Sequence, residues 1–99
     1  MVLARVVGTV VSTSKVPQIA GIRFLVVERL DALTMEGTGD HVVAMDSVGA
    51  GPGEVVFYVS GSSSRLTPTT EGRPSDATIT AIVDEVELGG RTVYRKDGL

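Results

Sequence analysis

The sequence predicts a small, mainly all-β protein: a closed or nearly closed barrel of five to seven short strands, with one or two short helical turns and a C-terminal hairpin. Two observations predict the strands. Runs of β-branched and aromatic residues recur along the chain and are bounded by Gly, Pro and Ser. Within these runs, residues alternate with a period of two rather than a helical period. Closure into a barrel is expected because it removes exposed sheet edges.

The first half of the chain predicts three strands and two loops. The strands are Leu3 to Ser12, Ile22 to Leu30 and His41 to Asp46. Lys15 to Gly21 is a loop because Pro and Gly interrupt it, and Asp31 to Asp40 is a polar loop. In the first strand, strict alternation would place Ala4, Val6, Gly8 and Val10 on one face and Arg5, Val7, Thr9 and Val11 on the other.

The second half begins with a strand at Val55 to Ser60. Ser62 to Leu66 is expected to form one helical turn with a serine N-cap, and Thr67 to Ser75 is irregular. Asp76 to Leu88 fits either a helix capped by its first residue or a strand. Its β-branched residues favour mostly strand, with a turn at Ser75 to Ala77.

The last predicted element is a hairpin. Gly89 and Gly90 form its turn, and a final short strand follows at Thr92 to Lys96.

Length and composition limit the class of protein. Residues 1–99 fit one domain, and 42% hydrophobic with 21% charged residues is ordinary for a globular chain. A net charge of −3 with scattered basic residues argues against a nucleic-acid partner. The chain has no cysteine, which excludes disulfides and thiolate metal sites. Its N-terminus matches neither a signal peptide nor a membrane span, so a soluble cytoplasmic protein is expected.

Candidates for catalysis are few. His41 is the single histidine, and its position at a strand start favours a surface or packing role over a general base or metal ligand. The serines of SGSSSR lack a nucleophile-elbow pattern. Asp84, Glu85 and Glu87 could offer carboxylates to a hard cation, but Asp84 would face opposite Glu85 on a strand. We interpret these carboxylates as a solvated or interface edge, and no cofactor or metal is expected.

The most distinctive segment is a glycine-rich turn between two strands. A glycine-rich loop can cradle phosphate, but this one lacks the P-loop lysine and precedes a strand instead of a helix. It is either a plain tight turn or a close-approach surface at a subunit contact or pore. Its residues are Ser47, Val48, Gly49, Ala50, Gly51, Pro52, Gly53 and Glu54.

Several motifs in order give the chain a family resemblance. They are an opening G-x-V-x-x-x-x-K from Gly8 to Lys15, the segment D-x-V-G-A-G-x-G-E from Asp46 to Glu54, the serine-arginine cluster Ser62 to Arg65, and A-I-V-D from Ala81 to Asp84. Together they resemble the pentameric vertex proteins of bacterial microcompartment shells, of the carboxysome and ethanolamine-utilisation type. The resemblance spans almost the whole chain.

The resemblance implies an OB-like barrel without catalytic activity, five copies of which close the corner of a shell and dock against hexameric shell proteins. As the charge and the N-terminal sequence indicate, no nucleic-acid or membrane partner is expected. The glycine-rich turn would lie at the five-fold axis or at the contact with hexamers, and the C-terminal segment between neighbouring subunits. Candidate contacts to subunits or hexamers are Arg5, Lys15, Arg29, Arg65, Ile82, Val83 and Asp84.

Two other classes stay open at this stage. An OB-like nucleic-acid-binding module would need aromatic stacking platforms and a basic groove. A small enzyme or ligand-binding barrel would need a pocket with convergent polar groups.

Overall fold

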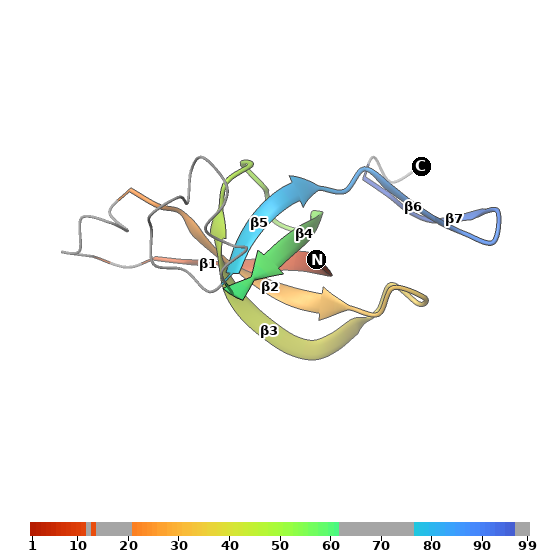
Figure 1. The fold of residues 1–99 in the computed structure, drawn as a ribbon, viewed down its shortest axis with the longest axis horizontal. Helices are drawn as coiled ribbons and strands as arrows, with labels where there is room; N and C mark the ends of the chain where they lie inside the picture. Colours follow the sequence, from red (N-terminus) through yellow and green to blue (C-terminus); the bar gives the residue numbers. More distant parts are fainter. Residues whose placement is uncertain (12, 14–20, 62–76, 97–99) are drawn as a thin grey trace.

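The computed structural model describes residues 1–11, 13, 21–61 and 77–96. Five strands close into a barrel in the order β1-β2-β3-β5-β4, and two more form a separate hairpin that extends from one end of the barrel (Figure 1). The barrel strands are β1 (Val2–Val10), β2 (Phe24–Leu30), β3 (Gly37–Asp46), β4 (Val55–Ser60) and β5 (Ala77–Ile82), and the hairpin strands are β6 (Glu85–Leu88) and β7 (Arg91–Arg95).

The barrel closes by one parallel pairing. Strands β1, β2 and β3 form an antiparallel meander, and β4 pairs antiparallel with both β1 and β5. The pairing of β3 with β5 is parallel and short, with Met45 opposite Thr78 and Asp46 opposite Ile79. Parallel strands cannot be joined by a tight turn, so the pairing of β3 with β5 requires the long stretch of chain that connects them.

Two apolar clusters stabilise the fold. The barrel interior is filled mainly by small and β-branched side chains, because the chain supplies few aromatic residues. Its fully buried members include Ala4, Leu25, Val27, Ala44, Val56 and Ile79. A second cluster, of Leu30, Val55 and Val83, lies where the hairpin meets the barrel, and Val86 and Tyr94 pack against it. The hairpin is therefore docked by apolar contacts.

The predicted all-β barrel with a C-terminal hairpin is confirmed, and the strand Val55–Ser60 has the predicted bounds. The predicted loop Asp31 to Asp40 is wrong at its end, because β3 begins at Gly37. Gly37 pairs with Leu30 beyond a register shift in which three residues of β3, from Thr38 to Asp40, lie opposite Arg29 of β2. The first residues of β3 are exposed and polar, so hydrophobic alternation gives no signal there.

The segment Asp76 to Leu88 is not one strand. The chain leaves β5 after Ile82 and begins β6 at Glu85. Between them, the Val83 N–H donates to the Val55 carbonyl at 2.8 Å and the Asp84 carbonyl accepts from the Lys96 N–H at 2.8 Å. Asp84 is thus outside the strands, which corrects the prediction that it faces opposite Glu85 on one strand.

A β-bulge in β1 also breaks the predicted alternation. Val6 pairs with Val27, but Gly8 pairs with Val26, so Val7 has no opposite residue. Ala4 and Val6 share the core-facing side, whereas Gly8, predicted on the same face, lies beside the outward-facing Val26.

The predicted helical turn Ser62 to Leu66 and the irregular segment Thr67 to Ser75 lie outside the described residues, as does the loop Lys15 to Gly21 except for its last residue. The described part of the chain holds no helix of the length and hydrophobicity needed to span a bilayer.

Candidate functional site

The β3–β4 turn, Ser47 to Glu54, is ordered at its start by the carboxylate of Asp46. This side chain is 2% exposed, and its Oδ2 pairs with Arg23 Nη1 at 3.1 Å. Its Oδ1 accepts backbone hydrogen bonds from the N–H groups of Val48, Gly49 and Ala50, at 3.1, 3.0 and 3.3 Å.

A second carboxylate, that of Glu54, orders the end of the turn. Its Oε1 accepts a hydrogen bond from the Gly51 N–H, and its Oε2 lies 3.2 Å from Lys96 Nζ. The hydrogen bond from Gly51, followed by the bond and charge of Lys96, holds the pKa of Glu54 below its ordinary value. Glu54 is therefore ionised wherever an ordinary glutamate is.

These two carboxylates explain why the turn is no phosphate cradle. The N–H groups from Val48 to Gly51 are the donors that an anion would need, and all of them donate to Asp46 or Glu54. A phosphate would meet two negative side chains and no available donor among these groups.

The tip of the turn is fixed to the first strand. Gly53 has a φ of 79°, a backbone conformation that a side chain disfavours. Its N–H donates to the Val6 carbonyl at 2.9 Å, and the Val6 N–H donates to the Glu54 carbonyl at 2.9 Å. Arg5 Nη1 donates to the Gly53 carbonyl at 2.8 Å. The turn therefore lies against β1 near its middle.

The C-terminal hairpin reaches the same place. The Tyr94 hydroxyl accepts a hydrogen bond from the Val55 N–H at 3.4 Å, and the Arg5 guanidinium lies 5.6 Å from the centre of the Tyr94 ring. With the Lys96–Glu54 ion pair, these contacts join the turn to the hairpin. We call Arg5, Glu54, Tyr94 and Lys96 the turn–hairpin clasp.

Of the predicted contact residues, Arg5 and Glu54 come together in this clasp. Val83 is 8% exposed and packs within its own chain, whereas Ile82 is half-buried and Asp84 is exposed. Lys15 and Arg65 lie outside the described residues. Sequence reasoning did not assign Tyr94 and Lys96 to the site. The one signal for them was a tyrosine within the polar run RTVYRK.

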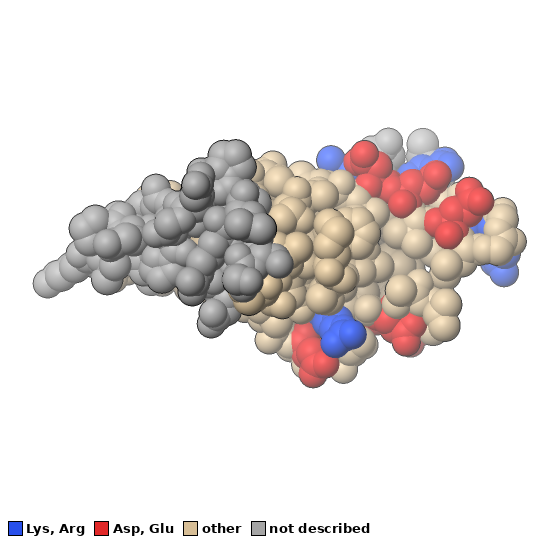
Figure 2. Space-filling view, viewed as in Figure 1, with Lys and Arg blue, Asp and Glu red and all other residues tan. Residues whose placement is uncertain are grey.

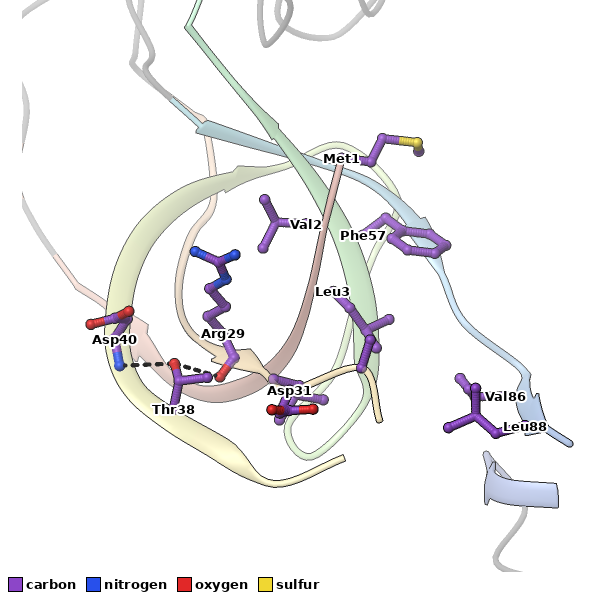
Figure 3. A pocket seen from close by; sticks show the side chains of 12 residues that line it. Met1, Val2, Leu3, Arg29, Asp31, Thr38, Asp40, Phe57, Val86 and Leu88 are labelled. Atoms are coloured by element: carbon purple, nitrogen blue, oxygen red, sulfur yellow. Dashed lines mark hydrogen bonds between the residues drawn. The ribbon is translucent and has the colours of Figure 1, made fainter. Parts of the chain in front are cut away.

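A second candidate is an open groove of about 620 Å³ at the end of the barrel next to the hairpin (Figure 3). Its wall includes Leu3, Phe57, Val86 and Leu88, and its polar side chains include Arg29, Asp31, Thr38 and Asp40.

Polar side chains of this groove form hydrogen bonds with nearby backbone groups and do not converge on a common point where a ligand could bind. The Thr38 hydroxyl donates to the Arg29 carbonyl at 3.0 Å and accepts from the Asp40 N–H at 3.3 Å. The Asp31 carboxylate accepts from two N–H groups of its own loop. In Figure 3 Arg29 points into the ring of strands, whereas the Asp40 carboxylate points away from it. This arrangement does not form a polar binding constellation.

The remaining titratable candidates also have local partners. The His41 ring is exposed and its Nδ1 lies 3.0 Å from the Gly39 carbonyl oxygen. Glu85 accepts from Arg95 Nη2 at 2.9 Å within the hairpin. On the face shown in Figure 2, acidic and basic side chains are intermixed toward the hairpin end and at the lower edge of the barrel, and the middle of the barrel wall between them shows none. Within the residues that the structure describes, no three His, Asp or Glu side chains are grouped as a metal site would require.

Comparison with known proteins identifies the family. The model of the family described as "Ethanolamine utilisation protein EutN/carboxysome" matches residues 1–84. The chain belongs to the EutN/CcmL family. This match includes the barrel, the β3–β4 turn and the Val83–Asp84 break, and it ends before the hairpin.

Similarity to individual EutN/CcmL proteins extends through the hairpin. The carboxysome shell vertex protein CcmL of Synechococcus elongatus is 44% identical over 96 residues, which cover 97% of this chain and 96% of that protein. The microcompartment shell vertex protein EutN of Salmonella typhimurium is 44% identical over 98 residues, with the same coverage.

Solved structures of vertex proteins are similar to this chain over nearly its whole length. The CcmL structure from Gloeobacter violaceus matches with a TM-score of 0.91 at 38% identity, covering 98% of this chain and 99% of that one. GrpN of Rhodospirillum rubrum, described as a pentameric microcompartment shell protein, matches with a TM-score of 0.80 at 43% identity, covering 89% of this chain and 99% of that one.

Proposed function

We propose that this chain is a structural shell protein whose homopentamers cap the five-fold vertices of a bacterial microcompartment. The similarity to named vertex proteins over 97% of the chain carries the proposal, and the pentameric description of GrpN supports the assembly. The role is mechanical and needs no catalysis or cofactor. The protein acts in the shell, which lies in the cytoplasm.

The surface of the barrel suits a ring of identical subunits. A cyclic pentamer must bring one face of each subunit against a different face of its neighbour. The wall formed by β1, β2 and β3 carries exposed apolar side chains, since Val7 is 47% and Val43 is 53% exposed. Gly8 and Val26 lie in the same row of the sheet as Val43. Apolar exposure of this kind favours burial against a second copy.

A flat sheet of hexagonal tiles needs five-fold tiles to close, so the pentamer is expected to dock against hexameric shell proteins. The β3–β4 turn, with Pro52 and Gly53 exposed at its tip, is our candidate for a close contact at the axis or with a hexamer. Charged residues near such a rim, including Arg5 and Arg29, would affect association rates and specificity more than affinity.

The first test is the solution mass of the purified protein, measured by native mass spectrometry. The proposal expects a mass five times that of the 10.3 kDa chain. A monomer or dimer at micromolar concentration would overturn it. Co-expression with hexameric shell proteins then tests capping: closed shells are expected with the chain, and open sheets or tubes without it.

A further inference from the structure

The β3–β4 turn makes side-chain contacts to the hairpin as well as backbone contacts to β1. Two long-range contacts join the turn and the first residue of β4 to the hairpin end: the Lys96–Glu54 ion pair, at 3.2 Å, and the hydrogen bond from the Val55 N–H to the Tyr94 hydroxyl, at 3.4 Å. The Glu54 side chain is 20% exposed and that of Lys96 41%, so solvent screens the pair only in part. Glu54 also accepts from the Gly51 N–H, which links the ion pair to the backbone of the turn.

We infer that Tyr94 and Lys96 are positioning residues that set the conformation of the β3–β4 turn, and that acid releases this coupling. The inference rests on the proposed function for its biological meaning, because the turn is the candidate contact surface of the shell. Glu54 is the switch: Lys96 approaches it from beyond β7, the Tyr94 phenol lies nearby on β7, and Arg5 on β1 binds the neighbouring carbonyl of Gly53.

The direction of the pH dependence follows from Glu54. Its pKa in the folded protein is lowered by the Gly51 N–H and by Lys96. A carboxyl of this kind stabilises the fold above the pKa of the unfolded chain, and the contribution is lost as pH falls through the lower folded pKa. The clasp is therefore closed at neutral pH. Protonation of Glu54 removes the charge that Lys96 pairs with and weakens the acceptor for Gly51.

The test measures amide hydrogen exchange at Gly51 by NMR, corrected for the intrinsic pH dependence of exchange, in Lys96→Met and in Glu54→Gln. Loss of a partly exposed ion pair is worth about 0.2–1 kcal/mol, so Lys96→Met should speed Gly51 exchange by about 1.4-fold to fivefold. In the same variant the pKa of Glu54 should rise toward its ordinary value. Glu54→Gln should remove the acid-induced rise in exchange that the natural protein shows, and Lys96→Arg should restore slow exchange.

The matched control is Arg95→Met. Arg95 lies next to Lys96 in sequence and forms an ion pair with Glu85 inside the hairpin, with side chains 42% and 44% exposed. Its removal changes the hairpin charge by the same amount without touching the turn. If Lys96→Met leaves both Gly51 exchange and the Glu54 pKa unchanged, or if Arg95→Met shifts them equally, the inference is wrong.

Tyr94→Phe tests the second contact. It should speed exchange of the Val55 N–H, because the phenyl ring keeps the packing against Leu30 and Val83 but cannot accept the hydrogen bond. Unchanged exchange at Val55 would remove Tyr94 from the proposal. All of these readouts concern the turn and the first residue of β4. A monomeric mass would therefore contradict the proposed shell function without contradicting the coupling of the turn to the hairpin. A pentamer in which these substitutions leave the turn unchanged would contradict the coupling but not the shell function.

Discussion

Asp46 illustrates, at the scale of one residue, how a side chain can replace regular structure. Its carboxylate serves three successive N–H groups that have no strand partner, and Arg23 balances its charge. A backbone donor without a partner is costly where it is buried, as at Ala50, so this side chain allows an irregular, glycine-rich segment to lie on the barrel.

We expect Asp46→Ala to lower the free energy of unfolding by about 2 kcal/mol, because it removes the charged acceptor of three turn N–H groups, of which that of Ala50 belongs to a buried residue. Urea denaturation at fixed protein concentration measures the change. Asp40→Ala is the control: Asp40 is exposed, and a surface substitution should stay within about 0.5 kcal/mol. Equal effects of the two substitutions would contradict the role given to Asp46.

Gly51 is a second position where the addition of a single side-chain atom would affect the turn. A Cβ added there would lie 3.2 Å from Glu54 Oε1, so a bulky side chain must displace the carboxylate. We expect Gly51→Trp to abolish the pentamer, measured by native mass spectrometry. Leu33→Trp adds an indole at a position that is 76% exposed and should assemble normally. A Gly51→Trp pentamer of normal stability would rule out the turn as a crowded contact.

The hairpin of β6 and β7 is informative at the scale of an element. Two strands alone are marginally stable in water, so this hairpin depends on its docking against Leu30, Val55 and Val83. Gly89 and Gly90 both have positive φ, at 57° and 81°, which is the conformation of a two-residue turn between twisted strands.

Val83→Ala should destabilise the hairpin more than the barrel. The side chain is 8% exposed, and its loss of two carbon atoms costs about 1.5 kcal/mol. Hydrogen exchange should accelerate most in β6 and β7, with β1 and β2 little affected. Val93→Ala, at a position 39% exposed, should change exchange very little. Uniform acceleration across the barrel after Val83→Ala would show that the hairpin is not a separate unit.

Most strands could be predicted from the sequence because their hydrophobic alternation or β-branched runs are strong, as in Val55–Ser60. Two features could not. The start of β3 is polar and exposed, so only its pairing with Leu30 defines it. The break at Val83 and Asp84 is set by hydrogen bonds to Val55 and Lys96, which are distant in sequence.

Contacts between residues distant in sequence also limited the prediction of the site. The motif from Asp46 to Glu54 pointed to the turn, since glycine spacing is a local signal. Tyr94 and Lys96 reach it from some 40 residues away, and no local pattern encodes that contact. The hydrogen bonds from the turn N–H groups to the carboxylates of Asp46 and Glu54 also depend on the backbone conformation of the folded turn.

At the scale of the whole molecule, exposed apolar side chains on the barrel wall couple stability to association. If the subunit buries Val7 and Val43 against a neighbour, the pentamer is stabilised by mass action.

We therefore expect the thermal midpoint to rise as protein concentration rises tenfold, measured by calorimetry or circular dichroism. Replacing Val43 by Asp, which places a charge on that wall, should lower the midpoint and reduce its concentration dependence. A midpoint that is independent of concentration in the natural protein would show that the folded barrel does not rely on its neighbours.

The parallel seam between β3 and β5 also sets an order of events during folding. The meander of β1, β2 and β3 can form from pairings that are local in sequence, whereas the pairings that close the barrel are distant in sequence: β1 with β4, as in Arg5 with Val55, and β3 with β5, as in Met45 with Thr78. Until β5 arrives, one edge of β3 and one edge of β4 have no barrel partner. A nascent chain therefore presents two open edges until its last third is synthesised, and this interval is when it is most exposed to strand-edge aggregation.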